Sequence, residues 1–349
     1  ENAGHLTFPF RRFQIQKVWR GERPQQGRFR EFVQADIDIV AENTLPFHFD
    51  VEVARVMAEA LAGAPLGEVE FVLQINNRKV LEGFYRGLGI DDPTAVMQIV
   101  DKLDKLPGEK ITELLVEAGL SAEQAQSCLA LAEICTTDAS FIDQVRALGV
   151  SPELLDEGLA ELAAVVDGCA GIEGVTVTAD LRIARGLDYY TGTVFETRMT
   201  GFESLGSVCS GGRYEQLASS GKRTYPGVGI SLGVSRLLAA LMASGLTTTR
   251  SVPSAVYVAV DDEESRSASN NIAQKLRARG VPCEVAASAS KFGKQIRSAE
   301  RRGIPYVWFP ANNEVKDIRS GEQVAADPDT WLPPENDLRP QVIVKETTA

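Results

Sequence analysis

One short stretch of the sequence gathers side chains that could grip a polar, ring-shaped ligand. Residues 184–196 read ARGLDYYTGTVFE and end in a strand-like run. Within it lie an arginine, two carboxylates and two neighbouring tyrosines: Arg185, Asp188, Tyr189, Tyr190 and Glu196. A structural segment needs one or two such groups, because burying polar side chains without partners is costly. The stretch therefore predicts a binding pocket at the mouth of a strand.

A second group of candidate residues is a cluster of arginines in a predicted turn. The sequence WRGERPQQGRFREF holds Arg20, Arg23, Arg28 and Arg30, and Phe32 belongs to the strand that follows. Guanidinium groups present planar donor forks that match phosphate oxygens, and an aromatic ring can stack on a base. The alternative interpretation is a solvated basic turn, which composition alone does not exclude.

The strand after this turn has one polar and one apolar face. The residues EFVQADIDIV alternate strictly, with Gln34, Asp36 and Asp38 on one face and aliphatic side chains on the other. Two carboxylates on one strand face are costly to bury without a cationic or donor-rich partner. A ligand that carries an amine is one such partner.

Two glycine-rich segments add further cations. YPGVGISLGVSRLLAALM (225–242) places glycines around a short strand and Arg236 at the start of an amphipathic helix, and SGGRYEQL (210–217) holds Arg213 and Tyr214. Glycine lets a backbone approach a phosphate closely, although each motif alone is more often structural. Together with the arginine turn, they indicate an enzyme that activates a small amino compound with a nucleoside triphosphate.

The elements that position these residues form a β-rich region. Periodicity predicts a hairpin over 11–40, a helix over 46–62, and strands over 68–77 and 175–182. Between about 84 and 170 the pattern changes to short helices with clear start signals: Asp92-Pro93, Ser121 with Gln124, and Ser151-Pro152.

These changes of pattern predict the domain organisation. We expect a discontinuous core of residues 1–84 and 170–248, interrupted by a helical insertion at 85–169. Beyond the polar linker TTTRSVPS, strands and helices alternate over 252–349, which predicts a small α/β domain with a largely parallel sheet. Residues 314–326 read as a final hairpin, and DTWLPPENDLRP reads as an extended tail.

One helix of this C-terminal domain carries a basic face. Lys294, Arg297 and Arg301 fall at i, i+3 and i+7. The plain interpretation is a solvated helix face, and the functional one is contact with a nucleic-acid backbone.

The overall composition narrows the function classes. A net charge of −12 repels phosphate, so any nucleic-acid contact must be local. Five scattered cysteines without a C-x-x-C pair argue against a zinc site and favour a reducing cytoplasm, and two histidines leave little material for Ser-His-Asp catalysis. No apolar run approaches the roughly 18 residues of a membrane helix, so we expect no membrane association.

The motifs together resemble a known family. RGERPQQGRFREF resembles the second signature of class II aminoacyl-tRNA synthetases, and GVGISLGVSRL resembles their third. ARGLDYYTGTVFE and SGGRYEQL resemble the two segments peculiar to histidyl-tRNA synthetases. The likeness runs from the first residues to about 330. It implies an α+β fold, with an antiparallel-sheet catalytic core, a helical insertion and a small α/β domain of the anticodon-binding type.

The resemblance also implies a reaction and its partners. L-Histidine would be activated by ATP, with Mg²⁺ present, to histidyl-adenylate, and the histidyl group would pass to the 3′ end of tRNA(His). The family further implies a cytoplasmic protein that is a homodimer when complete.

Roles for single residues follow from the same resemblance. Catalysis is implied for Arg185 and Arg20, and ATP binding for Arg20, Glu22, Phe32 and Arg236. Histidine binding is implied for six residues: Gln34, Asp38, Tyr189, Tyr190, Arg28 and Tyr214. Contact with tRNA is implied for Arg23 and Gln25 in the turn, and for Lys294, Arg297 and Arg301 in the C-terminal domain.

The sequence departs from the family pattern at several points. Asp38 stands where the family often has glutamate, and Glu215 stands where aspartate is expected. We also expect that the first class II signature, with much of the dimer interface, is missing ahead of ENAGHLTFPF. Two non-enzymatic functions are the alternatives: a regulatory paralogue of histidine biosynthesis and a tRNA-sensing module. Such paralogues typically lack the C-terminal domain and the arginine that Arg185 matches.

Overall fold

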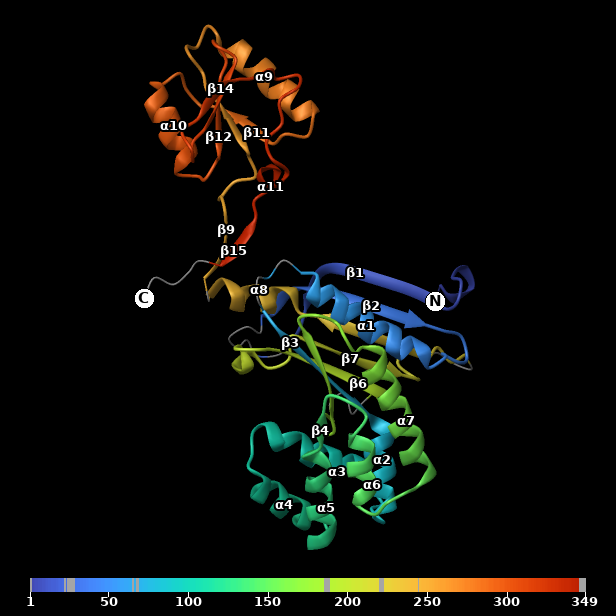
Figure 1. Ribbon diagram of the computed structural model, residues 1–349. Coiled ribbons are helices and arrows are strands. Elements are labelled where there is room, and N and C mark those ends of the chain that lie inside the picture. Colours follow the sequence, from blue (N-terminus) through green and yellow to red (C-terminus); the bar gives the residue numbers. More distant parts are fainter. Residues whose placement is uncertain are drawn as a thin grey trace. The chain divides into compact units, whose positions relative to one another are not determined.

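The computed structural model describes residues 2–21, 23, 29–64, 66, 69–184, 189–219, 223–243 and 245–344. The chain divides into two compact units, Glu1–Leu241 and Met242–Ala349, whose elements are drawn in Figure 1. Within the described residues, no helix is both long and apolar enough to cross a membrane.

The first unit is built on an eight-stranded sheet formed by described residues. Its order across the sheet is β1 (Phe10–Trp19), β2 (Glu31–Val40), β8 (Gly227–Leu232), β7 (Cys209–Tyr214), β6 (Tyr190–Met199), β3 (Phe71–Asn77), β5 (Val175–Asp180) and β4 (Cys135–Thr136). Neighbouring strands are antiparallel except for β3 and β5, which run parallel. This sheet confirms the α+β class that the sequence predicts.

Helix α1 (His48–Ala62) packs along one face of the sheet (Figure 1). Its buried side chains recur every three or four residues, as an amphipathic helix requires: Phe49, Asp50, Val53, Ala54, Met57, Ala58 and Leu61. Ile37 and Ile39 of β2 line the same hollow as Val53, so the apolar face of β2 points toward α1. Because side chains alternate along a strand, the carboxylates of β2 point to the other face.

Three further elements flank the strands of this sheet. They are η1 (Ala3–His5), η3 (Glu203–Leu205) and α8 (Val234–Ala243). The Ser235 hydroxyl of α8 accepts a hydrogen bond from the backbone N–H of Val33, at 2.9 Å, which ties this helix to β2.

A helical segment separates β3 from β5. It contains α2 (Arg78–Gly87), α3 (Pro93–Val100), η2 (Asp101–Asp104), α4 (Gly108–Glu117), α5 (Ala122–Ala132), α6 (Phe141–Ala147) and α7 (Glu153–Gly168). Two predicted helix starts are confirmed, because Asp92 caps α3 and Ser121 forms a capping box with Gln124. Gly83 of α2 and Gly158 of α7 each touch the backbone of the other helix, so neither position has room for a Cβ.

The second unit contains a five-stranded sheet within its described residues. Its order is β11 (Cys283–Val285), β10 (Val256–Val258), β12 (Tyr306–Phe309), β13 (Glu314–Asp317) and β14 (Gln323–Ala325). The first three strands are parallel, and β13 and β14 form the antiparallel hairpin predicted over 314–326. Helices α9 (Arg266–Ala278) and α10 (Phe292–Glu300) pack on opposite faces, each over its own apolar cluster (Figure 1).

The end of the chain differs from the extended tail that the sequence predicts. Trp331 packs edge-on against Trp308, with ring centroids 5.6 Å apart. A short helix, α11 (Glu335–Leu338), follows, and β15 (Val342–Val344) pairs with β9 (Leu246–Thr248). The prediction was wrong because these residues are ordered by tertiary contacts that local composition does not encode.

Candidate active site

The predicted hairpin of β1 and β2 is confirmed, and its register determines which side chains meet. The two strands pair over ten residues, with Gln14 opposite Asp36 and Arg12 opposite Asp38. At the turn, the backbone N–H of Arg20 donates to the carbonyl of Arg30 at 2.9 Å. Of the turn residues with predicted roles, Arg23 is exposed. Glu22, Gln25 and Arg28 lie outside the described residues.

A row of polar side chains crosses the sheet on the face opposite α1. Successive strand registers align Gln14, Asp36, Ser231, Ser210, Glu196, Gln74 and Thr178. Asp36 accepts a hydrogen bond from the amide of Gln14 at 2.9 Å through Oδ2. Its Oδ1 is buried and has no hydrogen-bond partner among the described residues. The row therefore presents an acceptor that a ligand could satisfy.

One cavity at the β2 end of this row brings together residues from three segments of the sequence. Its lining includes Arg20, Phe32, Gln34 and Arg236. The Arg20 guanidinium carbon lies 4.2 Å from the centroid of the Phe32 ring. The guanidinium of Arg236 donates to the backbone carbonyls of residues 207, at 2.7 Å, and 205, which orients it. The cavity is thus lined by two guanidinium groups, an aromatic ring and a side-chain amide.

Asp38 lies at the centre of a second polar group, toward the other end of β2. Its Oδ2 is 3.0 Å from Nη1 of Arg12, and its Oδ1 accepts a hydrogen bond from the Tyr214 hydroxyl at 3.2 Å. Burial raises the pKa of the Asp38 carboxyl, while the Arg12 charge and the Tyr214 hydrogen bond oppose that rise. The sequence analysis did not predict a role for Arg12, because the contact with Asp38 depends on the hairpin register.

Glycines beneath these polar side chains explain why the two glycine-rich motifs occur where they do. The positions are Gly212, Gly227 and Gly229. A Cβ on Gly229 would lie 2.1 Å from Oδ1 of Asp38, and one on Gly227 would lie 2.4 Å from the Tyr214 ring. On Gly212 it would lie 2.9 Å from the Tyr190 ring. The glycines therefore let three polar side chains lie flat against the sheet.

The tyrosine pair of the opening motif stands at the start of β6. The rings of Tyr189 and Tyr190 are 4.3 Å apart and steeply inclined, and Tyr190 is the more buried of the two. Burial raises the pKa of the Tyr190 hydroxyl. Glu196 of the same motif is 2% exposed and pairs with Gln74, farther along the sheet. Arg185, which belongs to the same motif, lies outside the described residues.

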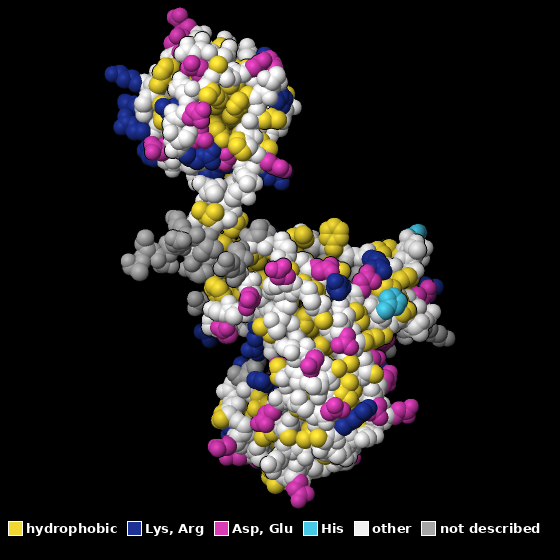
Figure 2. Space-filling model, in the orientation of Figure 1, with side chains coloured by type: hydrophobic (Ala, Val, Ile, Leu, Met, Phe, Trp, Pro, Cys, Tyr) yellow, Lys and Arg dark blue, Asp and Glu magenta, His cyan; other side chains and the backbone are white. Residues whose placement is uncertain are grey.

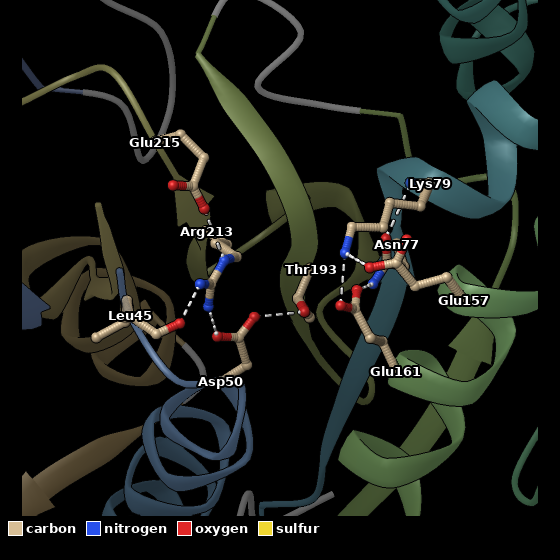
Figure 3. A network of polar contacts seen from close by, with 9 residues as sticks. All are labelled: Leu45, Asp50, Asn77, Lys79, Glu157, Glu161, Thr193, Arg213 and Glu215. Carbon is tan, nitrogen blue, oxygen red and sulfur yellow. Dashed lines mark hydrogen bonds and ion pairs between the residues drawn. The ribbon is translucent and has the colours of Figure 1, made fainter. Parts of the chain in front are cut away.

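Figure 3 shows a polar network around Asp50 and Arg213 that sequence reasoning missed. Asp50 of α1 is fully buried, and its carboxylate pairs with Nη1 of Arg213 at 2.7 Å and accepts from the Thr193 hydroxyl at 2.7 Å. Arg213 also donates to the carbonyl of Leu45 and to Glu215. Burial raises the pKa of Asp50, and Arg213 opposes this. The network holds the residue next to Tyr214.

A second network of polar contacts, also drawn in Figure 3, joins the helical segment to the sheet. Asn77, at the end of β3, caps α2 and donates to Glu161 of α7 at 2.7 Å. Lys79 donates to both Glu157 and Glu161 at 2.7 and 2.6 Å. Asn77 also pairs in register with Thr193 of β6, so the two networks meet at that strand.

The predicted basic face of the second unit lies on and just after α10. Lys294, Arg297 and Arg301 are all exposed, and none has an acidic partner among the described residues. Figure 2 shows Lys and Arg side chains gathered on the side of this unit where α10 lies.

Metal-binding chemistry has few candidates in the described part of the chain. No group of three or more His, Cys, Asp or Glu side chains there is arranged to hold a metal ion. All five cysteines are free thiols, and Cys135 alone among them is exposed. The absence of a zinc site stays a prediction from cysteine spacing.

Comparisons with known proteins show similarity to histidyl-tRNA synthetases over almost the whole chain. Residues 5–237 match the family model described as histidyl-tRNA synthetase, and residues 254–325 match an anticodon binding domain. A histidine–tRNA ligase of Cutibacterium acnes is 59% identical, covering 98% of this chain and 78% of that protein. One from Micrococcus luteus is 56% identical, covering 98% and 76%.

Solved structures agree with these sequence matches. The crystal structure of histidyl-tRNA synthetase from a Nostoc species has a TM-score of 0.82 and 34% sequence identity, covering 93% of this chain and 77% of that one. The family model alone spans more than half of the chain. The chain belongs to the histidyl-tRNA synthetase family.

Proposed function

We propose that the chain activates L-histidine with ATP and transfers the histidyl group to the 3′ end of tRNA(His). Family membership supports this, and one observation carries it: Arg20, Phe32, Gln34 and Arg236 line a single cavity. These residues supply phosphate-binding cations, a stacking ring and a polar contact for an amino acid. The non-enzymatic alternatives are not favoured, because relatives at 56–59% identity are histidine–tRNA ligases.

ATP occupies the cavity in this proposal. Arg20 binds the α-phosphate, Phe32 stacks on adenine, and Arg236 binds the distal phosphates. The 4.2 Å contact between Arg20 and Phe32 supports adjacent sites for base and phosphate. The carbonyls that hold Arg236 support a preset orientation of its donor fork. Glu22 is proposed as a further adenine contact.

Histidine lies beside ATP along the polar face of β2. Gln34 binds the amino side of the substrate, and Asp38 accepts a hydrogen bond from the imidazole N–H. The ring packs between Tyr190 and Tyr214, whose positions over glycines support a flat pocket floor. Further contacts to the substrate fall to Tyr189 and Arg28.

The reaction then proceeds in two steps with ATP supplied as its Mg²⁺ complex. A carboxylate oxygen of histidine bonds to the α-phosphorus while the bond to the β-phosphate oxygen breaks, which releases pyrophosphate. A ribose hydroxyl at the tRNA 3′ end then attacks the acyl carbon, loses its proton and displaces AMP. Arg20 and Arg185 stabilise the negative charge that develops on the α-phosphoryl oxygens, since preorganised cations lower such barriers.

Recognition of tRNA is divided between the two units in this proposal. The acceptor end meets Arg23 and Gln25 in the hairpin turn. The exposed cations of α10, together with Arg301, meet the tRNA backbone, which the match of residues 254–325 to an anticodon binding domain supports. The domain limits follow the same division: a catalytic core of 1–84 and 170–248, a helical insertion of 85–169 and an anticodon-binding domain of 252–349.

A homodimer is the proposed assembly of the complete protein. Three large apolar side chains of edge strand β1 support it: Phe13, Ile15 and Trp19 are 76%, 68% and 70% exposed. They share one strand face, which a second subunit would shield from water. Light scattering of the purified protein tests the assembly.

The test of the proposed function is histidine-dependent exchange of pyrophosphate into ATP. We expect exchange with L-histidine and none above background with the other amino acids. Exchange that is absent with histidine, in a folded protein that binds ATP, would contradict the proposal.

A further inference from the structure

The carboxylate assigned to the imidazole already has a cationic partner. We propose that Arg12 is a specificity-determining residue of the histidine pocket: it neutralises Asp38, so that the pocket takes the neutral imidazole and disfavours a cationic side chain. This inference deepens the proposed function and rests on it. Family resemblance assigned Arg12 no role.

The geometry places Arg12 directly on the carboxylate. The two residues face each other in the β1–β2 register, and Nη1 of Arg12 lies 3.0 Å from Oδ2 of Asp38. The other carboxylate oxygen accepts from Tyr214 at 3.2 Å. The side chains are 35% and 20% exposed, so the pair is half-desolvated and its charges are less screened than those of a surface pair. Tyr214 and Arg12 thus hold Asp38 from opposite sides.

Few other charges surround this carboxylate in the part of the chain that the structure describes. The titratable or charged groups that face it come from four strands: Arg12 of β1, Asp36 of β2, Tyr190 of β6 and Tyr214 of β7. Strand β8 contributes Gly229, which has no side chain. On the opposite face of the sheet, Arg11 pairs with Glu52 of α1. Among the described groups that face Asp38, the charged ones are therefore two carboxylates and one guanidinium.

Of these two carboxylates, Asp36 has no cationic partner among the described residues, whereas Asp38 has one. Asp36 accepts a hydrogen bond from the neutral amide of Gln14 through Oδ2. Its buried Oδ1 has no hydrogen-bond partner among the described residues. Asp38 forms an ion pair with Arg12. An amino acid that binds with a charged ammonium and a neutral side chain balances this arrangement, with the ammonium toward Asp36 and the imidazole toward Asp38.

Removing Arg12 reverses the preference between the two forms of the imidazole. Without the guanidinium, an uncompensated carboxylate favours imidazolium over imidazole, because an opposite charge at close range stabilises the charged form. The pKa of the free imidazole is about 6.5. The wild-type KM for histidine should then fall as pH rises through that value, and the KM of an Arg12 variant should rise.

The test measures KM for histidine and for ATP by pyrophosphate exchange at about pH 6 and about pH 8, for wild type, Arg12→Met and Arg12→Lys. If each protein bound one form exclusively, the ratio of KM for Arg12→Met to wild type would rise about 100-fold over that interval, and we expect at least about tenfold. Arg12→Lys keeps the charge and should retain the wild-type profile. KM for ATP should not change its pH dependence.

Arg11→Met is the matched control, because it removes a neighbouring arginine and its ion pair from the opposite face of the same strand. Its KM ratio should be the same at both pH values. A ratio for Arg12→Met that does not vary with pH would overturn the inference, since a structural role alone gives a uniform loss. Wild-type exchange with histidine separates the two failures: its absence contradicts the proposed function, and its presence with a flat ratio contradicts only the role of Arg12.

Discussion

The proposed histidine pocket and the basic face of α10 hold charged side chains in opposite ways. In the pocket, Asp38 is half-buried and held by two partners at 3.0 and 3.2 Å. On α10, Lys294 and Arg297 are exposed and have no acidic partner among the described residues. The first arrangement fixes a side chain before the ligand arrives, and the second leaves long side chains free to adapt to a solvated backbone.

We attribute the difference to the size and hydration of the two proposed ligands, histidine and tRNA. A small molecule that must be desolvated is discriminated by polar groups that would be left unpaired by the wrong ligand. A polyanion that keeps much of its water is attracted by charge, and each contact contributes modestly and depends on salt. Single substitutions in the pocket should therefore cost much more than single substitutions on α10.

The largest effect is expected from Arg185→Ala. Loss of a cation that acts mainly in the transition state should lower the pyrophosphate exchange rate about 100- to 1000-fold. Histidine and ATP should still bind with nearly unchanged affinity. Arg86→Ala, which removes a surface arginine paired with Glu82, is the control and should leave the rate unchanged. Equal losses of affinity and rate would show that Arg185 binds substrate instead.

The polar network around Asp50 and Arg213 should govern stability. Arg213→Met leaves the Asp50 carboxylate buried without its cation, which should lower the free energy of unfolding by about 3–5 kcal/mol. Combining it with Asp50→Asn should recover part of that loss, because the uncompensated charge is gone. Urea unfolding of Arg213→Met, of Asp50→Asn and of the double variant measures the effect. A loss that is the sum of the two single losses would mean that the pair is not coupled.

Within the pocket, Tyr214→Phe removes a hydrogen bond to a charged group. Such bonds are worth about 1.5–3 kcal/mol, so KM for histidine should rise about 10- to 100-fold. KM for ATP should stay within a factor of about two, because Tyr214 faces Asp38 and not the cavity lined by Arg20. Similar increases for both substrates would contradict the assignment of Asp38 to the imidazole.

The smallest effects are expected on α10. Lys294→Ala and Arg297→Ala should each raise KM for tRNA(His) a few-fold and reduce the salt dependence of binding by about one counterion. Histidine-dependent exchange should not change. Lys275→Ala on α9 is the matched control, since that lysine is already paired with Asp329 at 2.6 Å. A lower rate of pyrophosphate exchange in these variants, or an equal rise in KM for tRNA with Lys275→Ala, would contradict the proposed difference between the two regions.

Local signals in the sequence predict local structure well in this protein. The strict alternation of residues 31–40 predicts the two faces of β2, and the capping residues predict the starts of α3 and α5. These features depend only on neighbours within a few positions. The roles of the phosphate-binding cations were inferred from motifs that resemble family signatures, and these roles stay a prediction.

Contacts between distant segments could not be predicted in the same way. Asp50 and Arg213 are 163 positions apart, and nothing in either segment indicates that a carboxylate within an apolar helix face has a buried partner. Arg12 meets Asp38 only through the register of the β1–β2 pair. The packing of Trp331 on Trp308 likewise depends on the folded C-terminal sheet.

The central claim is tested most directly by attachment of labelled L-histidine to tRNA(His). The account predicts ATP-dependent formation of histidyl-tRNA by the wild-type protein, with no attachment of other amino acids. A folded protein that binds histidine yet forms no histidyl-tRNA would contradict the account and would favour a regulatory relative.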